Sequence, residues 1–481
     1  MTIGVLSDKL LLGIFRYYLD ASPHHWLRLV HICTKWRRIV FASQRALHLR
    51  LFCTRGTRVL STLDCWPTLP IVVCFEGSPA LDPDPEDEVN ITAALKQSGR
   101  VSSISLIVTS SFLETFSTIK EPFSNLEDLV LLSRDSAQLT LPSTFRCGPC
   151  LRSLHLTKVA FPAHMQLLYS SRNLVDLQLH EIVNFAPEAF VNALSQMDQL
   201  RYLSLHFLSR ADSFHSPFPS GERPALTHFD LREINTYSEG LVTRINAPGL
   251  RDIEITFFDK RIFYVPKLLE FVDRIKMQKS PRWADILSSE RAISISLTQQ
   301  GAPTRLRLRV LCKTSRLQPF CVAQICTFFS AFLFRVEDIR ISTTQLSSAQ
   351  DDNNCEQWLR TIRQFSGAKW LHIAGEHLTN VVRALQLSDK RRETVLPVLH
   401  KICIQEPAAR SALSQDALVP FMRSCWLSGR FIAVEYERLW TNGLREKGTT
   451  DAQCRHLTLT CFEQDLFQTG QQLRFSPTTS F

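Results

Sequence analysis

Apolar residues recur through the middle of the chain in a short pattern with nearly constant spacing. The template Leu-x-x-Leu-x-Leu, with Val, Ile or Phe allowed at apolar positions, begins at Val101, Leu126, Leu151, Leu174, Leu200, Leu226 and Leu250. The steps between these positions are 25, 25, 23, 26, 26 and 24 residues. Alternation within a match predicts a short strand whose alternate apolar residues, such as Leu154 and Leu156, are buried on one face. The constant step predicts stacked strand–helix units that bury one continuous core.

The segments around these strands carry helix and hairpin signals. Pro187 to Met197 is predicted as a helix with Pro in its first turn. Two alternating runs, Ile293 to Leu297 and Leu306 to Val310, flank Gly301 and predict a β-hairpin. Looser matches begin at Val336, Ala368 and Leu399, and further strands are predicted over Phe431 to Tyr436 and Leu457 to Cys461.

The first forty residues have a helical rather than a strand period. Ser7-Asp8 is an N-cap pair that opens a helix with Leu6, Leu10, Ile14 and Phe15 on one side. Ser22-Pro23 ends this helix. A second helix is predicted to carry one apolar stripe, formed by Trp26, Leu29, Val30, Cys33, Trp36 and Val40. So small a module needs a partner or the rest of the chain to remain folded.

Charge and composition limit the possible functions. Residues 1–58 hold ten Lys or Arg and two acids, a net charge of +8, against +9 for all 481 residues. This concentration favours an acidic partner for the N-terminal module. The longest nearly uncharged apolar run, Cys321 to Phe334, is shorter than a membrane span and predicts a buried helix. The 14 scattered Cys predict reduced thiols, and hence a cytoplasmic or nuclear protein.

Leu6 to Val40 resembles an F-box, with a leucine-rich opening, an Ile-Phe pair, a break, and then Leu29-Val30-His31-Ile32-Cys33-Thr34-Lys35-Trp36-Arg37. The family usually opens with Leu-Pro, whereas this chain has Leu6-Ser7. The later spacing is similar to that of leucine-rich repeats. The Asn or Cys of such repeats is replaced by an apolar row, which indicates a degenerate array: Val159, Ile182, Leu208, Ile234 and Phe258. The combination resembles the expanded F-box families of mushroom-forming fungi.

The resemblance implies an α/β fold in which an F-box-like helical module precedes a leucine-rich-repeat-like solenoid with a parallel sheet. It also implies a non-catalytic substrate adaptor of a cullin-based ubiquitin ligase, bound through a Skp-type adaptor protein. The residues that match the adaptor-binding positions are Leu6, Leu10, Leu11, Ile14, Phe15, Leu29, Val30, Cys33 and Trp36. The alternative is that this stripe is only the core of a helical hairpin. The chain would then be a repeat-based binding or scaffold protein.

The expected boundaries are a helical module at 1–45, a connecting segment with an acidic, Pro-rich linker at 46–95, and the solenoid at 96–410. C-terminal repeats at 411–470 and a mobile tail at 471–481 complete the chain. Polar positions between the buried residues of successive strands form a possible target-binding face: His155, Gln178, Ser204, Asp230, Glu254, His180, His206 and Arg232. For any one of these residues, ordinary solvated strand surface is the favoured interpretation.

Several chemical motifs have simpler explanations. Cys147-Gly148-Pro149-Cys150 is similar to the thioredoxin motif, but it leads into a strand and is predicted to be a turn. Together with His155 the two cysteines lack the second ligand pair of a zinc site. His24-His25 near Cys33 is predicted to be a helix-hairpin loop with surface histidines. No P-loop or hydrolase motif is found. We therefore expect no enzyme activity, no cofactor and no membrane partner, and the basic N-terminus lacks a nucleic-acid-binding signature.

Overall fold

The computed structural model describes most of the chain, which forms two compact units of residues 1–226 and 227–481. The described residues are 6–54, 57–66, 68–75, 85–135, 137–161, 166–182, 187–207, 221–222, 225–233, 236–258, 265–274, 281–299, 305–343, 354–374, 377–391, 394–407, 411–439 and 456–459. Leu208 and Ile234 of the predicted apolar row lie outside them, as does the predicted tail.

The first unit opens with short helices. Helix α1 (Asp8–Ala21) begins as predicted at Ser7, whose side chain accepts the Leu10 N–H at 3.4 Å. The predicted second helix is wrong in one respect, because it is divided into η2 (Pro23–His25), α2 (Trp26–Val30) and α3 (Thr34–Ala42). The backbone is extended at Cys33, and Arg37 Nε donates to the Val30 carbonyl at 2.9 Å. The side chain thus satisfies a carbonyl that a continuous helix would have bonded internally.

The segment expected to be a connection is part of the sheet. It forms β1 (Leu51–Cys53), α4 (Val59–Cys65), β2 (Ile71–Phe75) and α5 (Pro85–Leu95). Strands β1 and β2 pair in parallel, and β2 continues onto β3 (Val101–Val108). The predicted linker overlaps α5, because Pro at the first position and acids in the first turn favour a helix start.

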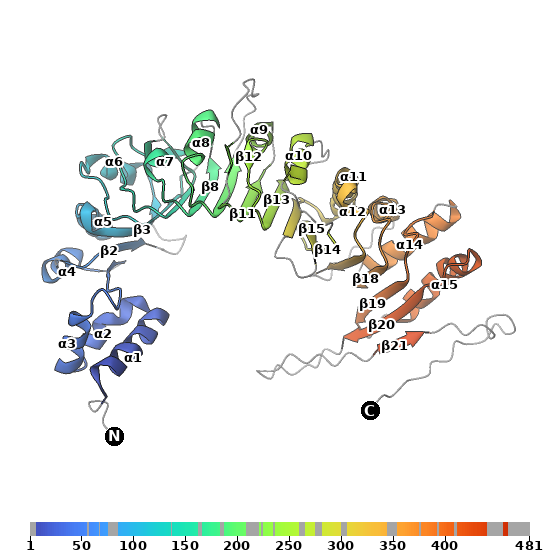
Figure 1. Ribbon diagram of the computed structural model, residues 1–481, viewed down its shortest axis with the longest axis horizontal. Helices are drawn as coiled ribbons and strands as arrows, with labels where there is room; N and C mark the ends of the chain where they lie inside the picture. The colour runs from blue at the N-terminus through green and yellow to red at the C-terminus, as the bar shows by residue number, and fades with distance from the viewer. Residues whose placement is uncertain are drawn as a thin grey trace. The chain divides into compact units, whose positions relative to one another are not determined.

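The repeated template predicts the next strands of the first unit. These are β4 (Asp128–Ser133), β6 (Ser153–Thr157), β8 (Asp176–Ile182) and β9 (Tyr202–Phe207), each parallel to the one before. The predicted apolar pairs are buried, as at Leu177 and Leu179, which are both 0% exposed. Helices α6 (Ser110–Thr118), α7 (Gln166–Ser170) and α8 (Pro187–Leu194) lie on one face of this sheet (Figure 1).

A left-handed residue precedes two members of the apolar row, whereas Phe258 is half-buried and follows no such residue. Lys158 has φ of 58° and Glu181 has φ of 53°, where L-residues are rarely found. The turn at each position directs the next residue inward, so Val159 and Ile182 are fully buried. Val159 belongs to β7 (Val159–Ala160), which pairs with β5 (Leu139–Thr140).

The second unit also has a mostly parallel sheet. Strand β11 (His228–Arg232) pairs with β13 (Asp252–Phe258), which pairs with β16 (Arg305–Leu311). The predicted hairpin is confirmed, since β15 (Ala292–Thr298) and β16 are antiparallel with Ile293 opposite Val310. Strand β14 (Trp283–Ser288), which was not predicted, lies antiparallel to β15 and parallel to β17 (Asp338–Thr343).

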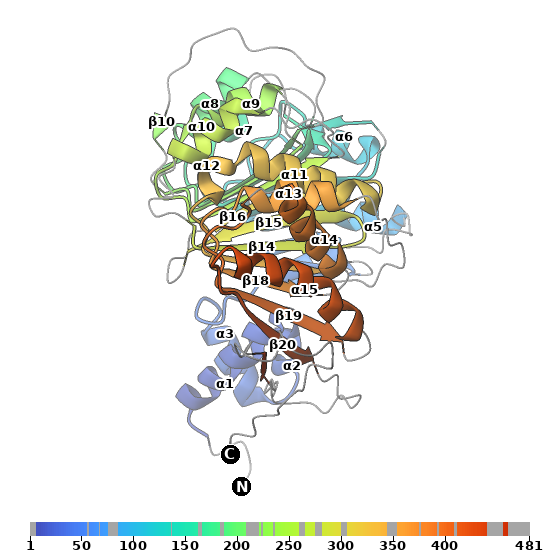
Figure 2. The same ribbon diagram turned by 90° about the vertical axis from the view of Figure 1, so that its right-hand side faces the viewer.

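The same sheet continues toward the C-terminus. The loose matches become β17, β18 (Trp370–Ala374) and β19 (Lys401–Pro407), followed by β20 (Ala433–Leu439) and an antiparallel β21 (His456–Leu459). The helices of this unit are α9 (Thr236–Val242), α10 (Pro266–Arg274), α11 (Gln318–Phe328), α12 (Ser330–Leu333), α13 (Cys355–Arg363), α14 (His377–Lys390) and α15 (Ser411–Leu427). Helices α11, α13, α14 and α15 cover one face of its strands (Figure 2).

The chain is therefore a mixed α/β protein built on mostly parallel sheet, as the strand–helix alternation predicts. The predicted buried helix over Cys321 to Phe334 is α11 followed by α12, in which Val322 and Cys326 are fully buried. Among the described residues, no helix combines the length and the apolar character that a membrane crossing requires.

Candidate functional site

Helix α1 has two apolar faces, and only one of them packs against the protein. Leu11, Phe15 and Leu19 repeat every fourth residue and are buried at 0%, 0% and 5% exposure. Leu10 and Ile14 form a neighbouring row and are 59% and 49% exposed. Exposed apolar side chains aligned along one helix are typical of a docking surface, whereas single ones are not.

The nine predicted adaptor-binding residues therefore divide between core and surface. Leu11, Phe15, Leu29 and Val30 are buried, as residues of a helical-hairpin core would be. Leu6 and Trp36 are half-buried, with the Trp36 ring 4.7 Å from that of Phe15. The exposed members are Leu10, Ile14 and Cys33.

Three exposed apolar residues of this module were not predicted, and one of them, Leu27 on α2, is 39% exposed. Tyr17, at 83% exposure, continues the spacing of Leu10 and Ile14 along α1. Ile32, at 57% exposure, lies in the break between α2 and α3. The helical period of Leu10, Ile14 and Tyr17 was the available signal. We call Leu10, Ile14, Tyr17 and Ile32 the exposed N-terminal set.

Several basic side chains of the helical module bind carbonyl or carboxylate oxygens of the same unit. Lys35 Nζ donates to the Leu6 carbonyl at 2.7 Å and lies 3.7 Å from Asp8. Arg38 is 3.4 Å from the same carboxylate, and Arg16 Nε donates to the Ala46 carbonyl at 3.2 Å. These contacts tie α1 to α3 and to the segment that leads into the sheet, and they reduce the charge available to an acidic partner.

Trp26 joins the helices to the rest of the first unit. It is 1% exposed, its Nε1–H donates to the Arg50 carbonyl at 2.8 Å, and its ring lies 5.5 Å from that of Trp66. Arg50 in turn is 3.3 Å from Glu127, next to β4. The helices thus share a core with the sheet, as expected for a module too small to fold alone.

The predicted target-binding residues of the first unit form a partly buried polar network. His155 and Gln178 are in register on β6 and β8, and both bond to Asp176, with His155 Nε2 2.9 Å from Asp176 Oδ2. Ser204 continues the register but is fully buried, which corrects the expectation that it faces outward. Its hydroxyl is 2.9 Å from His180 Nε2. His206 is half-buried on β9.

This network lacks the geometry of a nucleophilic relay. Ser153 Oγ and Asp176 Oδ2 both contact the same ring nitrogen of His155, at 3.2 and 2.9 Å. A relay needs the hydroxyl on one nitrogen and the carboxylate on the other. The contacts instead order the polar surface of the sheet.

Asp128 of β4 is a carboxylate on this face that stands outside the network. It is half-buried, and within the described part of the chain it makes no hydrogen bond or ion pair. Burial and the neighbouring Glu127 raise its pKa, although Arg50, His155 and Arg152 act in the opposite direction. Asp128 was not predicted because it precedes the two polar columns that lie between the buried residues of the template.

The predicted target-binding residues of the second unit form ion pairs with basic or acidic neighbours. Asp230 and Glu254 are in register, but Asp230 is only 7% exposed, which corrects the prediction that it projects into solvent. Arg232 Nε is 3.0 Å from Asp230, and Arg307 is 3.5 Å from Glu254. The basic side chains therefore already neutralise the two acids.

A further polar cluster, on the strands of the second unit, was not predicted. Trp283, Asp338 and Trp370 are in register on adjacent strands, with the Arg340 guanidinium 5.0 Å from the Trp283 ring. His372 Nε2 is 3.4 Å from Asp338. Hydrogen bonds to Asp338 and Cys403 raise the pKa of His372 to about 9, so this histidine is charged at neutral pH. Polar alternation along each strand was the available signal.

The cysteine motif is a turn, as predicted. Cys147 is buried and bridges Phe123, and burial raises the pKa of its thiol, the reverse of a reactive cysteine. A Cβ at Gly148 would lie 2.5 Å from the Ser124 carbonyl oxygen, so the close approach requires glycine. Within the described segments, no group of His, Cys, Asp and Glu could hold a metal ion.

Comparison with known proteins does not place this chain in a family. It matches no protein-family model, and no curated protein matches it either.

Proposed function

We propose that the chain is a non-catalytic recognition adaptor of a cullin-based ubiquitin ligase. In this proposal, the F-box-like helices bind a Skp-type adaptor and a leucine-rich-repeat-like solenoid binds the target protein. The observation that carries the proposal is the second apolar row of α1, in which Leu10 and Ile14 are about half exposed although Leu11 and Phe15 already fill the core. A helix that needed only to fold would not require that row.

Two further features support the proposal. The F-box-like pattern from Leu6 to Arg37 includes Ile32 and Cys33, and both are exposed. The successive parallel strands of the first unit follow the repeat spacing and present polar residues that could contact a target. Such a protein would act by raising effective concentration, while other chains carry the chemistry. The described cysteines form no disulfide, which fits a reducing compartment, either cytoplasm or nucleus.

Co-expression with a Skp adaptor tests the proposal. The wild-type chain should co-purify with the adaptor, and Leu10→Ser/Ile14→Ser should lose at least about tenfold in affinity because two anchors leave the interface. Leu132→Ser is the matched control, since Leu132 is 40% exposed on β4, in the same unit but outside the helical module. A double variant that binds like the wild type would contradict the assignment of this surface.

A second candidate function is a repeat-based scaffold whose helices only cap the sheet. The burial of Trp26 and its packing on Trp66 favour this candidate, because both bury the module against its own unit. If the folded wild-type chain does not bind a Skp adaptor, the scaffold becomes the preferred function.

A further inference from the structure

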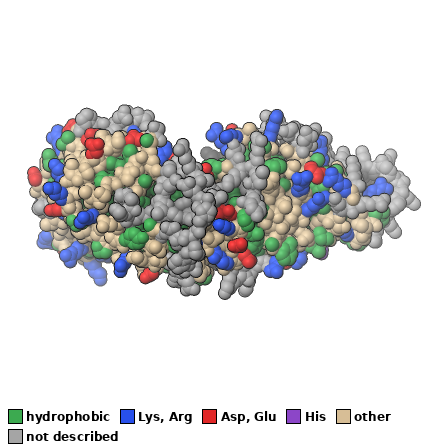
Figure 3. Space-filling model, turned by 90° about the horizontal axis from the view of Figure 1, so that it is seen from above, with side chains coloured by type: hydrophobic (Ala, Val, Ile, Leu, Met, Phe, Trp, Pro, Cys, Tyr) green, Lys and Arg blue, Asp and Glu red, His purple; other side chains and the backbone are tan. Residues whose placement is uncertain are grey.

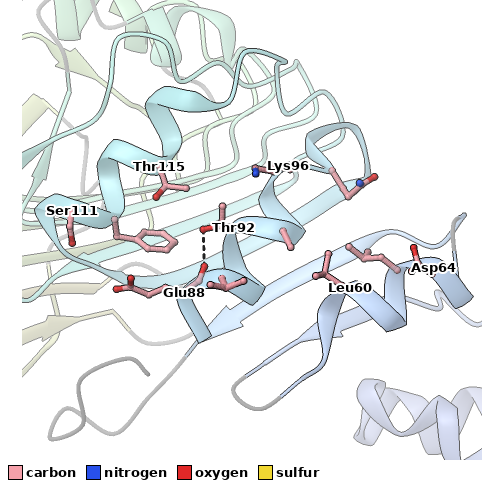
Figure 4. Close-up of a pocket in the computed structure, with 12 residues that line it drawn as sticks. Leu60, Asp64, Glu88, Thr92, Lys96, Ser111 and Thr115 are labelled. Atoms are coloured by element: carbon pink, nitrogen blue, oxygen red, sulfur yellow. Dashed lines mark hydrogen bonds between the residues drawn. The ribbon is translucent and has the colours of Figure 1, made fainter. Parts of the chain in front are cut away.

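Three helices of the first unit border a groove of about 680 Å³ that lies outside the exposed N-terminal set and the polar strand surfaces. Figure 4 shows α5 between the other two helices, with Leu60 on α4, Glu88 and Thr92 on α5, Lys96 directly after α5, and Thr115 on α6. The groove therefore follows the outer face of α5 and has a helix on either side.

The sequence of α5 explains the hollow. Its inner face carries Ile91, Ala94 and Leu95, which are all buried. On its outer face, Thr92 and Ala93 lie between Val89 and Lys96. Because these two side chains are short, they leave a hollow above the middle of the helix. The Thr92 hydroxyl donates to the Glu88 carbonyl at 2.7 Å and is thus used within the helix.

The lining of the groove includes two exposed apolar side chains. Leu60 and Val89, at 60% and 61% exposure, line it from α4 and α5. Leu63 and Phe112 contribute buried apolar surface beneath them. On the face of the molecule shown in Figure 3, hydrophobic side chains emerge only in small separate areas among polar and charged ones. Two large exposed apolar side chains that line one hollow indicate a contact surface.

Charge and length limit the occupant. The charged residues of the lining are Asp64, Glu88 and Lys96, so acids outnumber bases. From Glu88 to Lys96 the groove follows α5 for about 12 Å, which is about two turns of a helix. A helix laid along it needs apolar side chains one turn apart and a basic residue beside Glu88.

We propose that this groove binds an amphipathic helical segment of a partner protein, with apolar side chains between Leu60 and Val89 and a Lys or Arg beside Glu88. This binding is independent of the Skp adaptor, which the proposed function assigns to the exposed N-terminal set. The interaction is thus a second one, carried by the outer helices of the first unit.

Selection of peptides on the full-length chain tests this inference. The probe is a phage-displayed library of amphipathic helices of about four turns. Its varied positions carry apolar, basic and acidic residues at equal frequency. The selected peptides should combine a basic residue with apolar residues one turn apart. Leu60→Ser/Val89→Ser and Glu88→Lys should each weaken their binding at least about tenfold, equivalent to about 1.4 kcal/mol.

Matched controls distinguish peptide binding in the groove from nonspecific binding to the protein. Leu132→Ser removes an exposed apolar side chain elsewhere in the unit, and Glu114→Lys reverses an exposed charge on α6 outside the lining; neither should change binding. Ala93→Phe, which fills the hollow, should abolish binding while thermal unfolding shows an intact fold. No selection above a blank surface, selection of acidic peptides, or equal binding to Leu60→Ser/Val89→Ser and the wild type would each overturn the inference.

Discussion

The two units share a backbone plan but present different strand surfaces. In the first unit, strands β3, β4, β6, β8 and β9 contain no Lys or Arg, and their acids are Asp128, Asp176 and Glu181. In the second unit, β11, β16 and β17 alone contribute Arg232, Arg305, Arg307, Arg309 and Arg340. Among the described residues, Asp128 is thus left unpaired in the first unit, whereas Asp230 and Glu254 are paired in the second.

This difference shows that core and surface are specified by separate positions. The buried residues of the strands are mostly aliphatic in both units, with Leu more frequent in the first and Ile in the second, whereas the intervening residues are free to vary. Substitutions can therefore probe first the core that the units share and then the surfaces in which they differ.

The largest effect is expected in the shared core. Leu177→Ala in the first unit and Leu371→Ala in the second should each lower the free energy of unfolding by about 2–5 kcal/mol, because both side chains are 0% exposed. Chemical denaturation with a fluorescence readout measures both. If one substitution cost less than about 1 kcal/mol, that unit would lack a close-packed core.

The second effect is a pH dependence of the second unit. Burial lowers the pKa of His377 to about 4, while its Nε2 lies 2.5 Å from Ser288 Oγ and its ring 4.9 Å from that of Trp358. The unfolded histidine takes up a proton near pH 6.5 and the folded one does not. Stability should therefore fall by about 3 kcal/mol between pH 6.5 and pH 4. His377→Gln should flatten this part of the pH profile in denaturant titrations.

His372 should have the opposite dependence. Its pKa is raised to about 9, so its stabilising contribution is complete below pH 6.5 and is lost as the pH rises through 9. The effect should be smaller, because His372 is only half-buried and solvent screens its pair with Asp338. Titration of the His372 ring by NMR measures this directly. An ordinary pKa near 6.5 would contradict the paired geometry.

A third test compares two carboxylates. Asp230→Asn should cost about 1 kcal/mol at pH 7, because Arg232 loses its charged partner at 3.0 Å. Asp128→Asn should instead raise stability, since the folded state raises the pKa of Asp128 and its ionised form is therefore disfavoured. At a pH below the pKa of Asp128 in both the folded and the unfolded state, this gain in stability should vanish. A loss of stability in Asp128→Asn at pH 7 would mean that Asp128 has a partner.

The smallest effect is expected at the left-handed turns. Lys158→Gly should raise the free energy of unfolding by up to about 1 kcal/mol, because glycine adopts a φ of 58° without strain. Loss of the Lys158–Glu181 pair, 3.6 Å apart and partly exposed, offsets part of this gain. Thermal unfolding of Lys158→Gly against Glu181→Gln, which removes only the charge pair, separates the two contributions.

The strands were predictable because their signal is local and repeated. Alternation with a period of two places Leu154 and Leu156, and likewise Leu177 and Leu179, on the same face of their strand. The nearly constant spacing between matches makes a random coincidence of the pattern an inadequate explanation. By contrast, β1 and β2 were missed because they lie in single short apolar runs outside the register. The first turn of α5 was mistaken for a linker because Pro and acidic residues also favour loops.

The candidate surfaces were only partly predictable. Periodicity identifies apolar rows on α1 but cannot decide which row faces the core, so Leu11 and Leu10 were grouped together although one is buried and the other exposed. Ser204 and Asp230 occupy outward positions on their strands, yet neighbouring side chains cover them. Burial of a polar residue depends on the strand beside it, which sequence spacing alone does not give.

Hydrogen–deuterium exchange of the full-length chain, with and without a Skp adaptor, tests the proposed adaptor function most directly. The proposal predicts slower exchange across residues 8–42 in the complex, with unchanged exchange in the strands of both units. It also predicts that Leu10→Ser/Ile14→Ser abolishes this protection. Unchanged exchange across residues 8–42 at saturating adaptor would contradict the adaptor function and leave the chain as a repeat-based scaffold.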